Sequence, residues 1–211
     1  VVSGPFPKGS DSSDPHSYAY DPSVKPMPYD PRLAKFLQVL VDEEFKASAA
    51  KFGDPIPEKR PLKLGVPDFE LAKVAAQAIV QQWIQVGIKA EIIVLPPGKS
   101  TAPELGYDLL YVMADMWEPA TDIERLIGEG GPGATDNPYI VQGLTRLRSA
   151  RNWREVRDAL QDLHALIDYH LPLLPLWQIT DRFAYVKNLE GPQSGQITLY
   201  QTIGSWQIPQ K

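Results

Sequence analysis

The sequence predicts an α/β fold in which a mixed sheet is flanked by helices. Three apolar, strand-like runs occur at Leu62–Val66, Lys89–Leu95 and Asp108–Met113. An amphipathic helical pattern over Phe69–Val86 separates the first two runs, as is typical of a βαβ unit. The chain has 211 residues, which suits one large domain or one and a fraction, and 43% of them are hydrophobic, enough for a sizeable core.

The other elements follow from periodicity and from start signals. Asp30 and Pro31 suit the N-cap and first position of a helix that runs to about Ala50. Its apolar residues recur at helical spacing on one face: Leu33, Phe36, Leu37, Leu40 and Val41. Further helices are expected at Thr121–Ile127, Tyr139–Ala150 and Asn152–Tyr169, and further strands at Arg182–Lys187 and Gln196–Gln201.

Two helices carry predicted caps and apolar stripes. Asp68 can cap the helix over Phe69–Val86, whose expected stripe is Leu71, Val74, Ala75, Ala78, Ile79 and Val86. Asn152 and Glu155 have the spacing of a capping box at the start of the last helix. The residues expected to be buried in that helix are Val156, Ala159, Leu160, Leu163 and Ile167.

The first 29 residues are rich in Pro, Ser, Asp and Tyr, which favours extended chain and turns over helix. One interpretation is a flexible linker. The other is an extended arm that docks through its aromatic residues, Phe6, Tyr18, Tyr20 and Tyr29. The predicted organisation is therefore an arm over residues 1–29 followed by an α/β lobe over residues 30–211.

Composition argues against several classes of function. The net charge is −5 and no run of Lys or Arg occurs, which argues against a nucleic-acid partner. The absence of cysteine excludes disulfides and thiolate metal sites. No apolar run is long enough to span a bilayer, and no cofactor is implied. The start at Val1, without a signal-peptide pattern, suggests an excised or processed piece of a longer protein.

Catalytic and metal motifs are weak. The run Gly128–Gly133 matches G-x-G-x-x-G in letters, but a short helix precedes it and Pro132 lies within it, so we interpret it as a loop. The three histidines, His16, His164 and His170, lack zinc-ligand spacing, and His164 is expected to be a core or boundary residue. No nucleophile elbow occurs, although a Ser/His/Asp triad stays open.

The loop after the third predicted strand is the best candidate for binding. Asp115 follows an apolar strand, where a buried carboxylate would need a cation or several hydrogen-bond donors. Trp117 could stack on a ligand beside it. Asp115, Glu118 and Asp122 form a local acidic group, for which a paired-carboxylate hydrolase is conceivable. For the last two we favour a structural interpretation, with Asp122 as a helix cap and Glu118 as a solvated side chain.

Four blocks of sequence resemble one family. The run Tyr29-Asp30-Pro31-Arg32-Leu33-Ala34-Lys35 is similar to the "Y-D-P-x-x-A-K" helix start of the family 5 solute-binding proteins of peptide and nickel ABC transporters. Three later blocks, in the family's order, are Leu62-Lys63-Leu64 with Ala72, Ala76, Ile79, Gln82, Gly87-Ile88 and Glu91; Tyr107-Asp108-Leu109-Leu110 with Ala114-Asp115 and Glu118-Pro119; and Leu171-Pro172, Pro175-Leu176, Tyr185-Val186 and Leu189–Gly191.

The resemblance implies a carboxyl-terminal lobe of such a protein, with a periplasmic-binding-protein-like fold, without its amino-terminal lobe. It implies a periplasmic or extracellular binding protein, either free or membrane-anchored in full length, that works with ABC permease subunits and is not an enzyme. The family's amine-binding Asp corresponds to Asp115, and Trp117, Tyr111 and Met113 are expected to contribute to a site for a peptide or similar small solute. The family often has Gly-Trp before that Asp, where this chain has Tyr111-Val112-Met113. The alternative is a degenerate lobe that serves as a protein-interaction or signalling domain.

Overall fold

The computed structural model describes residues 1–9, 14, 16–53, 55, 60–179, 184–192 and 200–209. The chain divides into two compact units, one formed by Pro28–Ala114 and the other by Val1–Met27 with Asp115–Lys211. Each unit is described separately below. The predicted organisation into an arm and one lobe stays a prediction.

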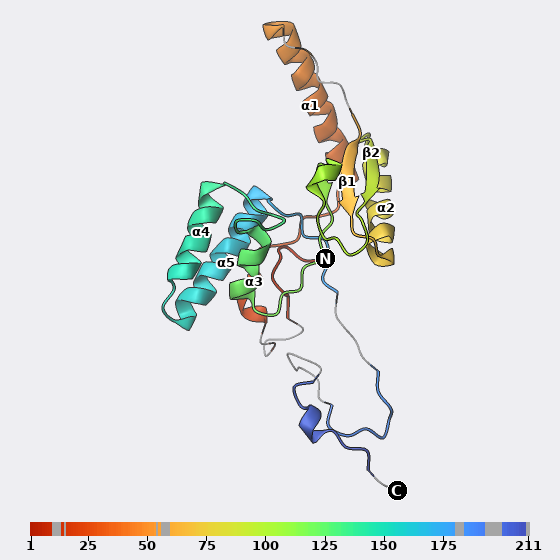
Figure 1. The fold of residues 1–211 in the computed structure, drawn as a ribbon. Helices are drawn as coiled ribbons and strands as arrows, with labels where there is room; N and C mark the ends of the chain where they lie inside the picture. Colours follow the sequence, from red (N-terminus) through yellow and green to blue (C-terminus); the bar gives the residue numbers. More distant parts are fainter. Residues whose placement is uncertain are drawn as a thin grey trace. The chain divides into compact units, whose positions relative to one another are not determined.

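The unit over Pro28–Ala114 is an α/β structure built on a three-stranded parallel sheet. The strands β1 (Leu62–Val66), β2 (Ala90–Val94) and β3 (Leu109–Leu110) have the order β2-β1-β3. Helix α2 (Glu70–Gln85) connects β1 to β2 and covers one face of the sheet (Figure 1). The predicted βαβ unit is therefore confirmed, and all three strands described here are parallel. A short 3-10 turn, η2 (Pro103–Leu105), precedes β3.

The core of this unit lies between α2 and the sheet. Its buried members are Leu64, Val66, Ala72, Ala75, Ala76 and Tyr111. Part of the predicted stripe of α2 is wrong, because Leu71, Val74 and Ala78 are exposed. The small side chains of Ala72 and Ala76 face β1 instead, which lets the helix backbone approach the strand closely.

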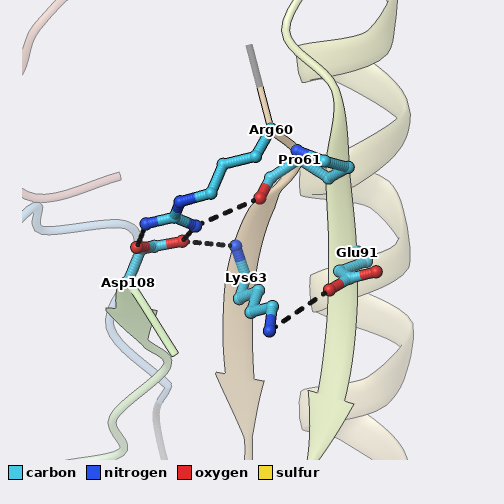
Figure 2. A network of polar contacts seen from close by, with 5 residues as sticks. All are labelled: Arg60, Pro61, Lys63, Glu91 and Asp108. Atoms are coloured by element: carbon cyan, nitrogen blue, oxygen red, sulfur yellow. Dashed lines mark hydrogen bonds and ion pairs between the residues drawn. The ribbon is translucent and has the colours of Figure 1, made fainter. Parts of the chain in front are cut away.

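Strand β3 is much shorter than the predicted Asp108–Met113, and a polar clamp holds its start on β1. Asp108 accepts two hydrogen bonds from the Arg60 guanidinium, at 2.7 and 2.5 Å, and a third from the backbone N–H of Lys63 at 2.9 Å (Figure 2). The Arg60 guanidinium holds the pKa of Asp108 well below its usual range. Lys63 also reaches Glu91 on β2, so charged contacts tie together the amino-terminal edge of all three strands.

Helix α1 (Pro31–Phe52) begins and ends at strong signals. The Asp30 carboxylate accepts from the backbone N–H groups of Arg32 and Leu33, and Gly53 ends the helix at a φ of 72°. The predicted helix is confirmed, but none of its residues is buried. Its apolar face, which packing would normally cover, is exposed.

The other unit is mainly helical. Its helices are α3 (Pro119–Ile127), α4 (Pro138–Ser149) and α5 (Trp153–His170), with short 3-10 turns η1 (Ser17–Ala19) and η3 (Ile203–Ser205). Helix α4 packs along α5, and α3 and η1 also contact α5 (Figure 1). The largest fully buried residues of these helices are Ile123, Ile127, Ile140, Leu160, Leu163, His164 and Ile167.

The N-terminus of α5 is capped by Asn152 and Glu155. The Asn152 side chain accepts from the backbone N–H of Glu155 at 3.1 Å, as the capping-box spacing predicts. The Glu155 carboxylate reaches one residue further back than expected, to the backbone N–H of Arg151 at 2.7 Å. Four of the five residues predicted for the buried stripe of α5 are buried, and Val156 is half-buried.

Aromatic residues of the first 27 positions pack onto α5. Phe6 and Tyr20 are buried, and both rings contact His164. Tyr18 packs against Trp153, whereas Tyr29 is largely exposed. Three of the four aromatic residues named for docking therefore contact α5: Phe6, Tyr18 and Tyr20.

The two last predicted strands fall largely outside the described residues. Gln196–Gln201 is described only at its last two positions, which form a turn. Arg182–Lys187 is described from position 184 onward, and those residues are not in a strand. Near them, Glu190 and Gln207 form an isolated antiparallel bridge. Among the described residues, no helix combines the length and the apolar character that crossing a membrane requires.

Candidate functional site

The candidate site is the carboxyl-terminal edge of the parallel sheet, between β1 and β3. The chain passes from β1 to β2 on one side and then returns to place β3 on the other side of β1. The neighbouring strands β1 and β3 therefore form the point where the strand order reverses, and open α/β sheets bind ligands outside the carboxyl ends of strands at such a point. The segments that leave this edge are Pro67–Phe69 after β1 and Tyr111–Ala114 after β3.

Tyr111 anchors the second of these segments. Its backbone N–H donates to the Gly65 carbonyl at 2.8 Å, and its ring belongs to the core cluster beside Leu64 and Val66. Burial raises the pKa of its phenol. Tyr111 is thus buried against the carboxyl-terminal edge of the sheet. Met113 is half exposed and is the more accessible of the two predicted site residues in this unit.

Asp68, at the end of the other segment, pairs with Lys73 in the first turns of α2. The expected capping role is wrong, because the N-cap is Phe69 and no side chain caps this helix end. The hydrogen bond to Asp68 raises the pKa of Lys73. The Asp68 carboxylate at this edge is therefore already paired with the Lys73 ammonium group, which lies on α2.

Asp115 and Trp117 belong to the other compact unit. The Asp115 side chain is exposed, so the expected burial of this carboxylate is wrong: β3 ends at Leu110, and four residues of open loop separate the two. No hydrogen bond or ion pair of the Asp115 side chain occurs within the described part of the chain. The Trp117 ring is 55% exposed. Both side chains are accessible to a ligand, and their binding role stays a prediction.

The loop that carries Trp117 is fixed at the start of α3. The Asp122 carboxylate accepts from the backbone N–H groups of Trp117 and Glu118, both at 2.8 Å, and so stabilises this helix entrance from within its first turn. Glu118 is exposed, as expected for a solvated side chain, and its carboxylate also accepts a hydrogen bond from the Tyr18 hydroxyl. Burial and this contact raise the pKa of Tyr18. Both acidic residues therefore have structural partners.

The four predicted site residues are thus divided between the units. Tyr111 and Met113 end the unit built on the sheet, whereas Asp115 and Trp117 begin the helical part of the other unit.

A buried polar cluster that the sequence did not reveal surrounds His164. The His164 Nδ1 atom accepts from the backbone N–H of Asp21 at 2.9 Å, so the ring proton lies on Nε2, which is 3.1 Å from the Ser3 hydroxyl oxygen. Ser3 in turn donates to the Tyr20 hydroxyl oxygen at 2.9 Å. Burial lowers the pKa of His164.

In this serine–histidine pair the hydrogen bond runs in the wrong direction for nucleophilic catalysis. A histidine that activates a serine must accept the hydroxyl proton, with its other nitrogen donating to a carboxylate. Here Nε2 donates to Ser3 and Nδ1 accepts from a backbone N–H. Ser3 and His164 are also both buried, so we assign the cluster a structural role. The sequence signals for it were the expectation of His164 as a core or boundary residue, which is confirmed, and the group of aromatic residues in the first 29 positions.

The glycine-rich run Gly128–Gly133 packs against the end of α3. A Cβ atom at Gly131 would lie 2.6 Å from the carbonyl oxygens of Arg125 and Leu126, and the N–H of Gly133 donates to the Leu126 carbonyl. A helix precedes the run, so the strand that a dinucleotide fingerprint requires is missing, as expected. Close packing explains Gly128, Gly131 and Gly133, whereas Gly130 adopts a left-handed φ of 78° with open space around it. Within the ranges that the structure describes, no group of three or more His, Asp or Glu residues is arranged to hold a metal ion.

Comparison with known proteins adds no family assignment. No protein-family model matches the chain, and no curated protein sequence matches it either.

Proposed function

We propose that the chain is one lobe of the substrate-binding component of an ABC importer. In this proposal it captures a peptide or a similar small solute between its own surface and a second, amino-terminal lobe of a longer protein. The protein works outside the cytoplasmic membrane, free or membrane-anchored, and delivers its solute to ABC permease subunits. Support comes from the four sequence blocks given above, which occur in the family's order.

The single observation that carries the proposal is the sheet order β2-β1-β3 with all strands parallel. This order creates a reversal point between β1 and β3 in a sheet of only three strands. The chain leaves β3 directly into the segment that holds Tyr111, Met113, Asp115 and Trp117. The residues that the family resemblance implies for the site therefore follow the carboxyl end of β3, and the sheet order favours ligand binding at that same end of the sheet.

Each predicted site residue has a role that fits its surroundings. Asp115 offers an accessible carboxylate without a protein partner in the described residues, which suits the ammonium group of a peptide. Trp117 offers an exposed ring for stacking, and Met113 offers an adaptable apolar contact. Tyr111 supports the segment from the core.

The test is isothermal titration calorimetry of two proteins against a peptide library. One is this chain, and the other is the longer protein with the proposed amino-terminal lobe. Sites for small ligands usually bury about 70–90% of the ligand surface, so the isolated chain should bind weakly and the two-lobe protein tightly. Submicromolar peptide binding by the isolated chain would argue against a two-lobe site, and no binding by the two-lobe protein would argue against the function.

A second candidate is a degenerate lobe used as a protein-interaction domain. The uncovered apolar face of α1 favours it, because large apolar patches on a protein surface mark interaction sites. The two functions differ in one simple respect: the interaction domain needs no second lobe in the gene that encodes it.

A further inference from the structure

Helix α1 carries an apolar face that the described residues of its own unit leave uncovered. Within this 22-residue helix, six large apolar side chains are between 45% and 58% exposed: Leu33, Phe36, Leu37, Leu40, Val41 and Phe45. Their spacing places them on one side of the helix. A stripe of this kind is ordinarily buried, so the helix is built to contact an apolar surface.

The polar side of α1 is the one turned toward its own unit. Gln38 approaches Gly87, where an added Cβ atom would lie 3.0 Å from the Gln38 amide oxygen. Gln38 also donates to the Asp42 carboxylate at 3.0 Å, and both residues are half-buried. At 100° per residue, Gln38 and Asp42 lie well away from the centre of the apolar face. The described part of this unit therefore leaves that face open.

The charges beside the apolar face are self-complementary. Arg32 and Glu43 are eleven positions apart, about three helical turns, so they lie on the same flank of the face. Their midpoint falls between positions 37 and 38, which is also the centre of the apolar group Leu33–Val41. Two copies of α1 that meet antiparallel about this midpoint would bring Arg32 of each copy beside Glu43 of the other. There Arg32 would join Lys46, which contacts the Glu43 carboxylate at 2.7 Å within α1.

The same arrangement accommodates Glu44, the one charged residue within the apolar face between Leu33 and Phe45. In antiparallel pairing about the midpoint, position 44 of one copy lies opposite position 31 of the other, next to Arg32. A parallel pair would instead place Glu44 against a second Glu44, and like charges at this spacing repel. Between two copies of this chain, the charges thus favour the antiparallel over the parallel arrangement.

We propose that α1 mediates formation of an antiparallel homodimer through the part of its apolar face from Leu33 to Val41. The occupant of the face is α1 of a second copy, the apolar side chains interlock at the centre, and two Arg32–Glu43 contacts flank them. The proposal is independent of solute binding, because it uses none of the predicted site residues.

Single-cysteine cross-linking tests the geometry directly, since the chain has no cysteine of its own. With Leu37→Cys, the two substituted positions are offset by only about 1.5 Å along the helices, so oxidation should produce a disulfide-linked dimer. With Leu33→Cys, the offset is about 13 Å, and no disulfide should form. Cross-linking through both positions would indicate a parallel pair and would overturn the proposal, as would cross-linking through neither.

Light scattering after size-exclusion chromatography gives a second readout. The wild type should approach twice the chain mass of 23.5 kDa as concentration rises. Arg32→Glu should weaken dimerisation about tenfold, and combination with Glu43→Arg should restore it. Lys35→Glu, on the side away from the apolar face, is the matched control and should have no effect. A strictly monomeric wild type would overturn the proposal and would favour the proposed amino-terminal lobe as the cover of α1.

Discussion

Replacement of His164 by leucine tests how the amino-terminal segment is held. The substitution removes the acceptor for the Asp21 N–H and the hydrogen bond to Ser3. A buried polar group left without a partner costs about 1–3 kcal/mol, and an aromatic contact contributes about 0.5–1.5 kcal/mol beyond its area. The apolar leucine recovers part of this through burial. We therefore expect the free energy of unfolding to fall by about 2–4 kcal/mol.

The same substitution should also change how the free energy of unfolding depends on pH. Because burial lowers the pKa of His164 in the folded state, the unfolded chain binds a proton more readily. The stabilisation that the neutral His164 side chain provides is complete above the ordinary histidine pKa of 6.5, and it decreases as pH falls below that value. The difference between wild type and His164→Leu should therefore be larger at pH 7.5 than at pH 5.5.

The assay is urea denaturation followed by tryptophan fluorescence at both pH values. Four of the five tryptophans, Trp117, Trp153, Trp177 and Trp206, lie in the unit that contains His164. His170→Leu, on the same helix, is the comparison variant: it removes the ring contacts with Tyr139 and Tyr169 but no buried hydrogen bond, so it should cost less than His164→Leu. A loss below 0.5 kcal/mol for His164→Leu, or a difference that grows toward pH 5.5, would refute the reasoning.

Three further substitutions probe the scaffold by chemical denaturation. Asp108→Asn removes the bidentate partner of Arg60 and should lower the free energy of unfolding at pH 7. Since the folded pKa of Asp108 is lowered, the difference from the wild type should decrease steadily as pH falls below the ordinary value of 3.8, and a constant difference would contradict this. Asn152→Ala should cost about 0.5–2 kcal/mol through the lost helix cap, and an unchanged midpoint would show that water replaces the cap. Gly65→Ala should cost about 1–3 kcal/mol, because its Cβ atom would lie 2.9 Å from the Tyr107 ring; a neutral result would mean that the ring moves away freely.

Local patterns predicted the elements well. Strand β1 and the helices α1, α2, α4 and α5 occur within one or two residues of the sequence-based bounds, because caps and periodicity act over a few residues. The length of β3 was not predictable in this way. Only Leu109 and Leu110 pair with β1, and pairing depends on contacts distant in sequence, such as the clamp from Arg60 to Asp108.

Tertiary contacts explain the wrong predictions. Apolar periodicity could not show that alanines of α2, and not Leu71 or Val74, would face β1. It also could not show that the Asp115 carboxylate would be exposed, since the length of the preceding strand decides this. The role of Ser3 depends on a contact across 161 positions, for which a single sequence carries no signal.

The most direct test of the proposed function is a titration of the two-lobe protein, wild type and Asp115→Ala, with a peptide and with the same peptide acetylated at its α-amino group. If Asp115 binds the ammonium group in a closed site, both the substitution and the acetylation should cost about 2–5 kcal/mol of binding, and the two losses should not add. Trp117→Ala, the comparison variant, should cost less, since stacking adds about 0.5–1.5 kcal/mol beyond area burial. Equal affinity of wild type and Asp115→Ala for the free peptide would contradict the account.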